Sequence, residues 1–364
     1  MNLLDEKIYA NALNLIPQLG PVSLNKLTAH FGSFAKAWQG QPSDYVLAGI
    51  KRETVDQIIP FKRKINPEQS FAEVTRRQIE ILLSLEKSYP QLLKEIMPVP
   101  PILYVRGKKE VLNSTAVAVV GTRKMSSYGQ LACDEIAMGL SSNGITIVSG
   151  LAFGVDAVAL QAAVTNSGRG IAVLASDLDN YSIAPRANFN LAQKILENGC
   201  LVSEYALGSS TQRQNFPIRN RIISGLSLGT LVVEADAESG ALITAGFALE
   251  QNREVFAIPG SIFSPTSRGT NQLIKQGAKL VSSAYDILEE LNLDSNNLPD
   301  APQIADTSET EAEILKFLTK NPLHIDDLIK TVKLTPQQVN ANLTLLEMKG
   351  RVKNLGGAKY VKIR

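Results

Sequence analysis

The stretch AVAVVGTR, residues 116–123, is a run of five apolar residues that ends in a glycine, a threonine and an arginine. Short, continuous, valine-rich runs are typical of parallel strands that are covered on both faces. A glycine directly after such a strand lets the backbone turn sharply and approach an anion closely. We therefore expect a buried strand, a tight turn and then a helix over the amphipathic segment 128–141.

Further apolar runs of this kind predict strands at residues 145–149, 171–174, 201–204, 230–235, 255–258 and 279–281. Segments of helical length, such as 241–251, separate most of these runs. Repeated strand–helix units predict a Rossmann-like α/β fold, with a doubly wound and mostly parallel sheet over residues 67–293. Ligands of such sheets bind at the carboxyl ends of the strands, near the point where the strand order reverses.

The part of the chain before this sheet has a different pattern. Residues 1–66 predict short helices of a SAM-like or helix-hairpin-helix-like domain, in which Leu19, Gly20 and Pro21 form a turn between two helices. Such a turn either contacts a DNA phosphate or belongs to a packing module. After the sheet, residues 294–308 combine acidic residues and prolines without apolar periodicity, and predict a linker.

Residues 309–364 predict three helices followed by a β-hairpin with Gly356 and Gly357 at its turn, which together make a winged helix. The third helix offers amides and no arginine for base contacts, while Lys359 and Lys362 lie on the wing. A weak contact with duplex DNA and a protein-interaction role both remain open for this domain.

Composition sets outer limits on function. Of the 364 residues, 44% are hydrophobic and 20% charged, as in ordinary globular proteins. The net charge of +2 neither supports nor excludes nucleic acid, because binding depends on a local basic patch. No apolar run approaches the roughly 20 residues of a membrane span, and no secretory signal is visible, so we expect a cytoplasmic protein. Cys133 and Cys200 lie in apolar segments and predict two buried, reduced thiols.

Two glycine loops follow the first two predicted parallel strands. Gly121, Thr122 and Arg123 either offer a phosphate a helix N-terminus and a guanidinium, or form a plain turn. Ser149 and Gly150 in the second loop either offer a hydroxyl and a close backbone approach, or simply pack beside the first loop. We expect both loops at the same edge of the sheet.

A third segment adds basic and aromatic residues to that edge. Arg186 stands near a helix start and suits a phosphate. Tyr181 and Phe189 either stack on a base or belong to the core.

A fourth segment carries Arg219 and Arg221 on one short predicted helix, where they point about 200° apart. One of these arginines is expected to bind phosphate, while the other pairs with an acid such as Glu204 or Glu234. The pattern does not say which arginine takes which role.

The residues favour binding over catalysis. His30 and His324 are the only histidines and lie in different predicted domains. The chain has no metal-ligand cluster, no P-loop and no G-x-G-x-x-G fingerprint, so we expect no cofactor, no metal and no enzyme. Carboxylates at the predicted edge can serve a hydrolase, although such residues more often cap helices or hold arginines. These carboxylates are Asp156, Asp177, Asp179, Glu204, Glu234 and Asp236.

The central part of the chain also carries several motifs in a fixed order. They are GTR at 121–123, SGLAFGVDA at 149–157, FPIRNRIISGLS at 216–227, SGALITA at 239–245, PG at 259–260 and GTNQLIKQGA at 269–278. Together they resemble the DNA-processing protein A family, also called DprA or Smf. The resemblance implies a single-stranded DNA-binding protein of natural transformation and recombination, which protects incoming DNA, loads the RecA recombinase and forms a homodimer.

The resemblance also implies roles for single residues. The phosphate-binding residues that it implies are Gly121, Thr122, Arg123, Ser149, Gly150, Arg186 and Asn188. It places a dimer interface around Leu273 and Ile274. Two positions depart from the family pattern: Leu160 stands where relatives usually have a histidine, and residues 175–182 lack the usual glycines.

A nucleotide-processing hydrolase is the alternative reading of this fold. Lysine-decarboxylase-like phosphoribohydrolases share the glycine-rich loops, but they usually carry a P-G-G-x-G-T-x-x-E helix start that this chain lacks. Release of a base from nucleoside monophosphates would distinguish such an enzyme from a DNA-binding protein.

Overall fold

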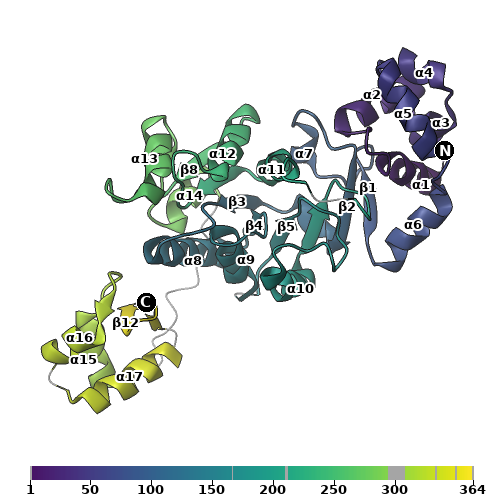
Figure 1. Ribbon diagram of the computed structural model, residues 1–364. Helices are drawn as coiled ribbons and strands as arrows, with labels where there is room; N and C mark the ends of the chain where they lie inside the picture. Colours follow the sequence, from purple (N-terminus) through teal and green to yellow (C-terminus); the bar gives the residue numbers. More distant parts are fainter. Residues whose placement is uncertain are drawn as a thin grey trace. The chain divides into compact units, whose positions relative to one another are not determined.

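The computed structural model describes residues 2–165, 167–209, 212–293, 308–332, 334–348 and 351–362. Residues 1–297 form one compact unit and residues 298–364 form a second (Figure 1). The linker expected at 294–308 lies outside the described residues, apart from Ser308. Each unit contains a β-sheet of its own.

The sheet of the first unit has nine strands in the described part of the chain, in the order β1-β2-β6-β5-β4-β3-β7-β8-β9. The strands are β1 (Glu80–Leu83), β2 (Ile102–Gly107), β3 (Ala116–Val120), β4 (Thr146–Ser149), β5 (Gly170–Val173), β6 (Cys200–Ser203), β7 (Gly229–Val232), β8 (Glu254–Ala257) and β9 (Lys279–Leu280). The pairs β1–β2 and β2–β6 are antiparallel. All other neighbouring strands of this sheet pair in parallel. The predicted Rossmann-like, mostly parallel α/β fold is confirmed, and β1 and β2 add an edge that was not predicted.

β3 is the strand at which the chain changes direction across the sheet. Its Val117 pairs with Ile147 of β4 on one side and with Gly229 of β7 on the other. The chain first adds β4, β5 and β6 in one direction, and then returns to add β7, β8 and β9 in the other. The carboxyl ends of β3 and β7 therefore meet at the switch point where sheets of this kind bind ligands.

Helices cover both faces of this sheet. α8, α9, α10 and α14 bury apolar residues against one face, and α7, α11, α12 and α13 against the other. Their bounds are α7 (Gln91–Lys94), α8 (Ser127–Ser142), α9 (Val155–Thr165), α10 (Phe189–Asn198), α11 (Asn215–Gly225), α12 (Gly240–Glu250), α13 (Arg268–Lys275) and α14 (Ala284–Glu290), with short 3₁₀ helices at Lys109–Asn113, Arg186–Asn188 and Pro265–Ser267. Cys133 and Cys200 are buried and free, as expected, and burial raises the pKa of both thiols.

The N-terminal helices share a core with the sheet. They are α1 (Leu3–Asn14), α2 (Pro21–Phe31), α3 (Phe34–Gln39), α4 (Pro42–Leu47), α5 (Arg52–Lys62) and α6 (Pro67–Arg76). Leu13 and Ile58 belong to the same hydrophobic cluster as Tyr104 of β2. Asn14 Nδ2 also donates to the carbonyl oxygen of Glu204, just beyond β6, at 2.8 Å. The expected turn at Leu19-Gly20-Pro21 connects α1 to α2, and these helices and the sheet form one continuous unit.

The second unit is a winged helix, as predicted. Its elements are α15 (Glu309–Phe317), β10 (Leu323–His324), α16 (Ile325–Thr331), α17 (Pro336–Met348), β11 (Val352–Asn354) and β12 (Lys359–Lys362). The strands pair in the order β10-β12-β11. Gly356 and Gly357 take positive φ angles of 86° and 58° at the hairpin turn, which explains the two glycines there. Among the helices that the structure describes in either unit, none is both long and apolar enough to cross a membrane.

A buried ion pair joins β6 to α11 within the first unit. Arg221 Nη2 lies 2.5 Å from both carboxylate oxygens of Glu204, and Arg221 Nη1 donates to the Pro98 carbonyl oxygen at 2.9 Å. The two side chains are only 5% and 7% exposed. Each charge is therefore sheltered from water and depends on the other for its stabilisation.

We expect Glu204→Gln to lower the free energy of unfolding of the first unit by about 3–5 kcal/mol, because it leaves the Arg221 charge buried without its carboxylate. Trp38, the only tryptophan, lies in α3 of this unit, so urea unfolding followed by tryptophan fluorescence measures the change. Arg52→Gln is the matched control, since it breaks the exposed pair with Asp56, which contributes less than about 1 kcal/mol. Equal urea midpoints for Glu204→Gln and the wild type would contradict the stabilising role of the pair.

Candidate nucleic-acid interface

A pocket of about 760 Å³ opens at the switch point between β3 and β7. We call it the basic pocket. The turn after β3, the first half of α11 and the first turns of α12 form its walls. Its charged side chains are Arg123, Lys124, Asp156, Arg213 and Arg219. Its volume lies in the usual range of ligand sites, roughly 300–1,000 Å³.

The charges of this pocket favour an anion. Arg123, Lys124 and Arg213 are exposed, and no carboxylate within the described ranges forms an ion pair with any of them. Asp156 is the only carboxylate among the described lining residues, and it is 7% exposed. Three accessible cations therefore surround a cavity whose single described carboxylate is buried in the protein.

Backbone contacts fix the turn that carries Arg123. The Thr122 N–H donates to the Glu234 carbonyl oxygen at 2.7 Å, and the Thr122 carbonyl oxygen accepts from the Val155 N–H at 3.2 Å. Gly154 has φ +78°, and a Cβ at this position would overlap the Thr122 carbonyl oxygen. The two glycine loops are thus packed backbone against backbone, as the sequence predicted for one edge of the sheet.

Arg219 forms the floor of the basic pocket. Its guanidinium donates to the carbonyl oxygens of Gly150, at 3.0 Å, and Val173. The Asp156 carboxylate beside it accepts the N–H groups of Gly150 and Ala152 at 3.2 and 3.3 Å. Burial lowers the pKa of Arg219 to about 10 and raises that of Asp156. Arg219 therefore stays protonated at neutral pH and holds the ends of β4 and β5 together.

The structure resolves which of the two arginines lines the pocket, and it corrects the expected phosphate contact of Ser149. Arg219 lines the pocket, whereas Arg221 is buried against Glu204 and cannot reach a ligand there. Ser149 is fully buried, and its hydroxyl donates to the Val119 carbonyl oxygen at 2.6 Å. The hydroxyl of Ser149 is thus used within the sheet instead of facing a phosphate.

Gly150 also has a packing role instead of an exposed one. Its N–H is bound by Asp156, and a Cβ on it would come within 2.5 Å of Arg219 Nη2. The residue is a glycine because the buried guanidinium and carboxylate leave no room for a side chain. This is the close-packing alternative that the sequence left open.

The third predicted segment lies beside the basic pocket. Asn188 Nδ2 donates to the carbonyl oxygens of Leu151 and Ala152 at 2.9 and 3.1 Å, which ties this segment to the second glycine loop. Arg186 is exposed and lies over the Phe189 ring, 4.1 Å from its centroid. Asn188 therefore orients the loop, and the same segment carries the exposed Arg186, whose Nη1 donates to the Asn180 carbonyl oxygen at 2.6 Å.

The two aromatic side chains of this segment differ in their exposure. Phe189 packs partly against the core, and the Arg186 guanidinium covers one face of its ring. Tyr181 is 93% exposed. Tyr181 is thus the ring of the two that is fully accessible to a base.

Sequence reasoning missed other residues of the pocket. Phe216 lies under the Arg123 guanidinium, 5.6 Å from its ring centroid, and Arg213 comes from the segment just before α11. Ser239 caps α12 by accepting the Ala241 N–H at 3.3 Å, which brings this helix N-terminus to the pocket. The motif SGALITA after a predicted strand is a recognisable helix start, so the last contribution was available in the sequence.

The predicted dimer residues are mostly covered by the chain itself. Leu273 is 8% exposed and belongs to the hydrophobic cluster beneath α13, and Ile274 packs partly against the same cluster. The Leu273 side chain therefore offers little surface in the single chain, and the dimer interface around Leu273 and Ile274 stays a prediction. More exposed apolar side chains lie in the preceding loop, where Ile262 and Phe263 are 80% and 89% exposed.

Comparison with known proteins finds family matches along most of the chain. Residues 80–292 match the family model of DNA recombination-mediator protein A, and residues 298–358 match the DprA winged helix domain. The Smf protein of Synechocystis is 34% identical, and the match covers 98% of each chain.

Two solved structures are also similar. DNA processing protein A from Streptococcus pneumoniae has 33% sequence identity and a TM-score of 0.68, over 80% of this chain and 99% of that one. DNA processing protein A from Helicobacter pylori, studied for its single-stranded DNA binding mode, has 29% identity and a TM-score of 0.53, over 59% of this chain and 96% of that one. The resemblance of the sequence motifs is confirmed, and the chain belongs to the DNA recombination-mediator protein A family.

Proposed function

We propose that this chain binds single-stranded DNA in the basic pocket, protects the bound strand and loads a RecA recombinase onto it. The observation that carries the proposal is the group of exposed cations, Arg123, Lys124 and Arg213, around a pocket whose acid is buried. The family of recombination mediators, and the single-stranded DNA binding of the Helicobacter pylori relative, support this choice of ligand.

A phosphate backbone suits the pocket better than a compact anion does. Arg123 provides a planar guanidinium for two parallel hydrogen bonds to a phosphate, while the N-terminus of α12 adds backbone amides and a partial positive charge. Arg186, on the neighbouring segment, suits a further phosphate along the same strand. Contacts of this kind are independent of sequence and weaken as the salt concentration rises.

Bases are expected to stack outside the pocket. The ring of Tyr181 is accessible on the same segment as Arg186, and the ring of Phe216 lies beneath the Arg123 guanidinium. Stacking on an aromatic ring tolerates every base, which matches a protein that must accept any incoming strand. A homodimer in which α13 contributes Ile274, and an exposed loop contributes Ile262 and Phe263, remains part of the proposal.

The carboxylates near the pocket have structural partners, which argues against the hydrolase alternative. Asp156 accepts two backbone N–H groups and faces Arg219. Glu234 accepts from the backbone and hydroxyl of Ser126 and from the hydroxyl of Thr266. Both carboxylates hold loops in place, which is the role that the sequence analysis favoured for them.

We expect Arg123→Ala to weaken binding to single-stranded oligonucleotides about tenfold, equally for all sequences, because it removes one phosphate contact. Labelled oligonucleotides are titrated at two or more salt concentrations. The plot of log affinity against log salt concentration should be less steep for the variant, because binding releases about one counterion fewer. Arg63→Ala removes an exposed arginine from the end of α5 and serves as the matched control. An unchanged affinity and an unchanged salt slope in Arg123→Ala would refute the pocket as the phosphate site.

Arg219→Lys should lower both stability and affinity, whereas Arg123→Ala should lower affinity alone. A single ammonium group cannot replace the guanidinium that bridges the Gly150 and Val173 carbonyl oxygens. We therefore expect the free energy of unfolding to fall by about 1–3 kcal/mol. Urea unfolding and oligonucleotide titration of the two variants measure these changes. If Arg219→Lys kept its stability, Arg219 would not be the residue that shapes the floor of the pocket.

RecA loading has a separate test. The wild-type chain should shorten the lag before RecA assembles on an oligonucleotide coated with single-strand binding protein. Arg123→Ala should shorten this lag less. A fluorescent RecA follows filament growth directly. A wild-type chain that binds the bare strand but leaves the RecA lag unchanged would contradict the loading role and leave DNA binding intact.

A further inference from the structure

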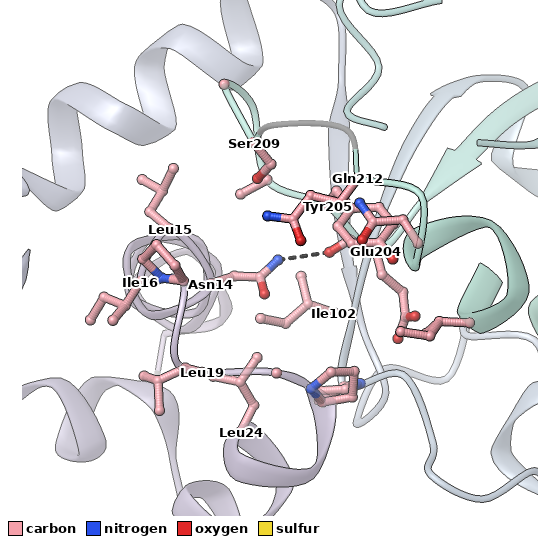
Figure 2. A pocket seen from close by; sticks show the side chains of 18 of the residues that line it. Asn14, Leu15, Ile16, Leu19, Leu24, Ile102, Glu204, Tyr205, Ser209 and Gln212 are labelled. Atoms are coloured by element: carbon pink, nitrogen blue, oxygen red, sulfur yellow. Dashed lines mark hydrogen bonds between the residues drawn. The ribbon is translucent and has the colours of Figure 1, made fainter. Parts of the chain in front are cut away.

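A second pocket of about 450 Å³ lies between the N-terminal helices and the sheet (Figure 2). We call it the neutral pocket. The turn between α1 and α2 forms one side, and described residues from the stretches 204–209 and 212–215 form the other. Leu19, Leu24 and Ile102 supply apolar surface, while Gly20 and Ile218 lie on its exposed rim.

The neutral pocket offers no net charge to a ligand. Glu204 is the one charged residue among its described lining residues, and its carboxylate is bound by Arg221 on the buried side. The other polar lining residues, such as Gln212 and Gln214, are amides and hydroxyls. A phosphate therefore finds no cation here, whereas a flat, uncharged group with hydrogen-bonding edges suits the apolar walls.

Asn14 gives the pocket one oriented acceptor. Its Nδ2 donates to the Glu204 carbonyl oxygen at 2.8 Å (Figure 2). The same Nδ2 donates to the Tyr104 hydroxyl at 3.3 Å, and the two bonds fix the orientation of the amide. No donor among the described residues reaches the Asn14 Oδ1 atom, which stays free to accept. All four nucleobases carry an N–H group that can donate to such an oxygen when the base is unstacked.

The two pockets share a wall. Residues 212–220, at the start of α11, contribute to both of them. Gln214 and Ile218 line the neutral pocket, while Arg213 and Phe216 line the basic pocket. The pockets are therefore separated by about the width of one helix, roughly 10–12 Å, a distance that an extended strand covers in a few nucleotides.

We propose that the neutral pocket receives one unstacked nucleobase of the strand whose phosphates occupy the basic pocket. The proposal rests on the proposed function, because it assigns a base site to the same bound strand. Flipping a base out is least costly in a single strand, where no pairing is lost. The turn at Gly20, which the sequence analysis left between DNA contact and packing, would then contribute to the DNA site as a wall of the base pocket.

Gly20 offers a direct way to fill the pocket. A Cβ at Gly20 would meet no atom within 4 Å, and its φ of −81° suits any residue. Gly20→Leu should therefore fold normally and place an apolar side chain in the mouth of the neutral pocket. Gly246→Leu is the matched control, since Gly246 of α12 also has no atom within 4 Å of a built Cβ and lines neither pocket.

The experiment compares an oligothymidylate with the same strand carrying one abasic site, moved stepwise along its length. For the wild type and Gly246→Leu, an abasic site at one position should cost about tenfold in affinity. In Gly20→Leu the intact strand should bind about tenfold more weakly, and the abasic site at that position should cost nothing further. The salt slope should be the same in all three proteins, because the phosphate contacts are untouched.

Several results would overturn the base site. These are an equal abasic penalty in Gly20→Leu and the wild type, a uniform weakening of intact and abasic strands alike, or no sensitive position in the wild type. A wild-type chain that binds neither strand would instead defeat the proposed function, and the base site with it. Urea midpoints from Trp38 fluorescence confirm that each variant is folded before it is titrated.

Discussion

The backbone of Thr122 is held from two sides, and the geometry of the basic pocket depends on this constraint. Its N–H binds the Glu234 carbonyl oxygen beyond β7, and its carbonyl oxygen binds the Val155 N–H at the start of α9. Gly154 keeps the second loop close enough for these contacts, because any side chain there would overlap Thr122. The turn after β3 is thereby fixed at the switch point of the sheet, and Arg123 is presented from a rigid backbone.

The first half of α11 completes the same arrangement with two buried guanidiniums. Arg219 binds the ends of β4 and β5 beneath the basic pocket, while Arg221 binds Glu204 beside the neutral pocket. The opposite directions of these side chains follow from their separation by two residues on a helix. Helix α11 is thus anchored on both sides, and it separates a positively charged cavity from an uncharged one. A nucleic acid strand has the same two kinds of group, charged phosphates and neutral bases.

Much of this fold follows from the sequence, and the errors have physical causes. The parallel strands were predictable because both of their faces are covered, which makes runs such as Ala116–Val120 continuously apolar. β1 and β2 were missed because they lie at the antiparallel edge, among prolines that suggest loops. Arg123 was predictable as a cation after a strand and a glycine. Ser149 was assigned to the ligand, and the roles of Arg219 and Arg221 stayed open, because the burial of these side chains depends on neighbours that are distant in sequence. Phe216 was overlooked for the same reason.

The central claim is that phosphates of a single strand lie at the end of β3. A crystal structure of the full chain with a short oligothymidylate tests it most directly. The account predicts a phosphate on the Arg123 guanidinium and near the N-terminus of α12, with the strand running toward Arg186. A strand bound only to the winged helix, with the basic pocket left empty, would contradict it.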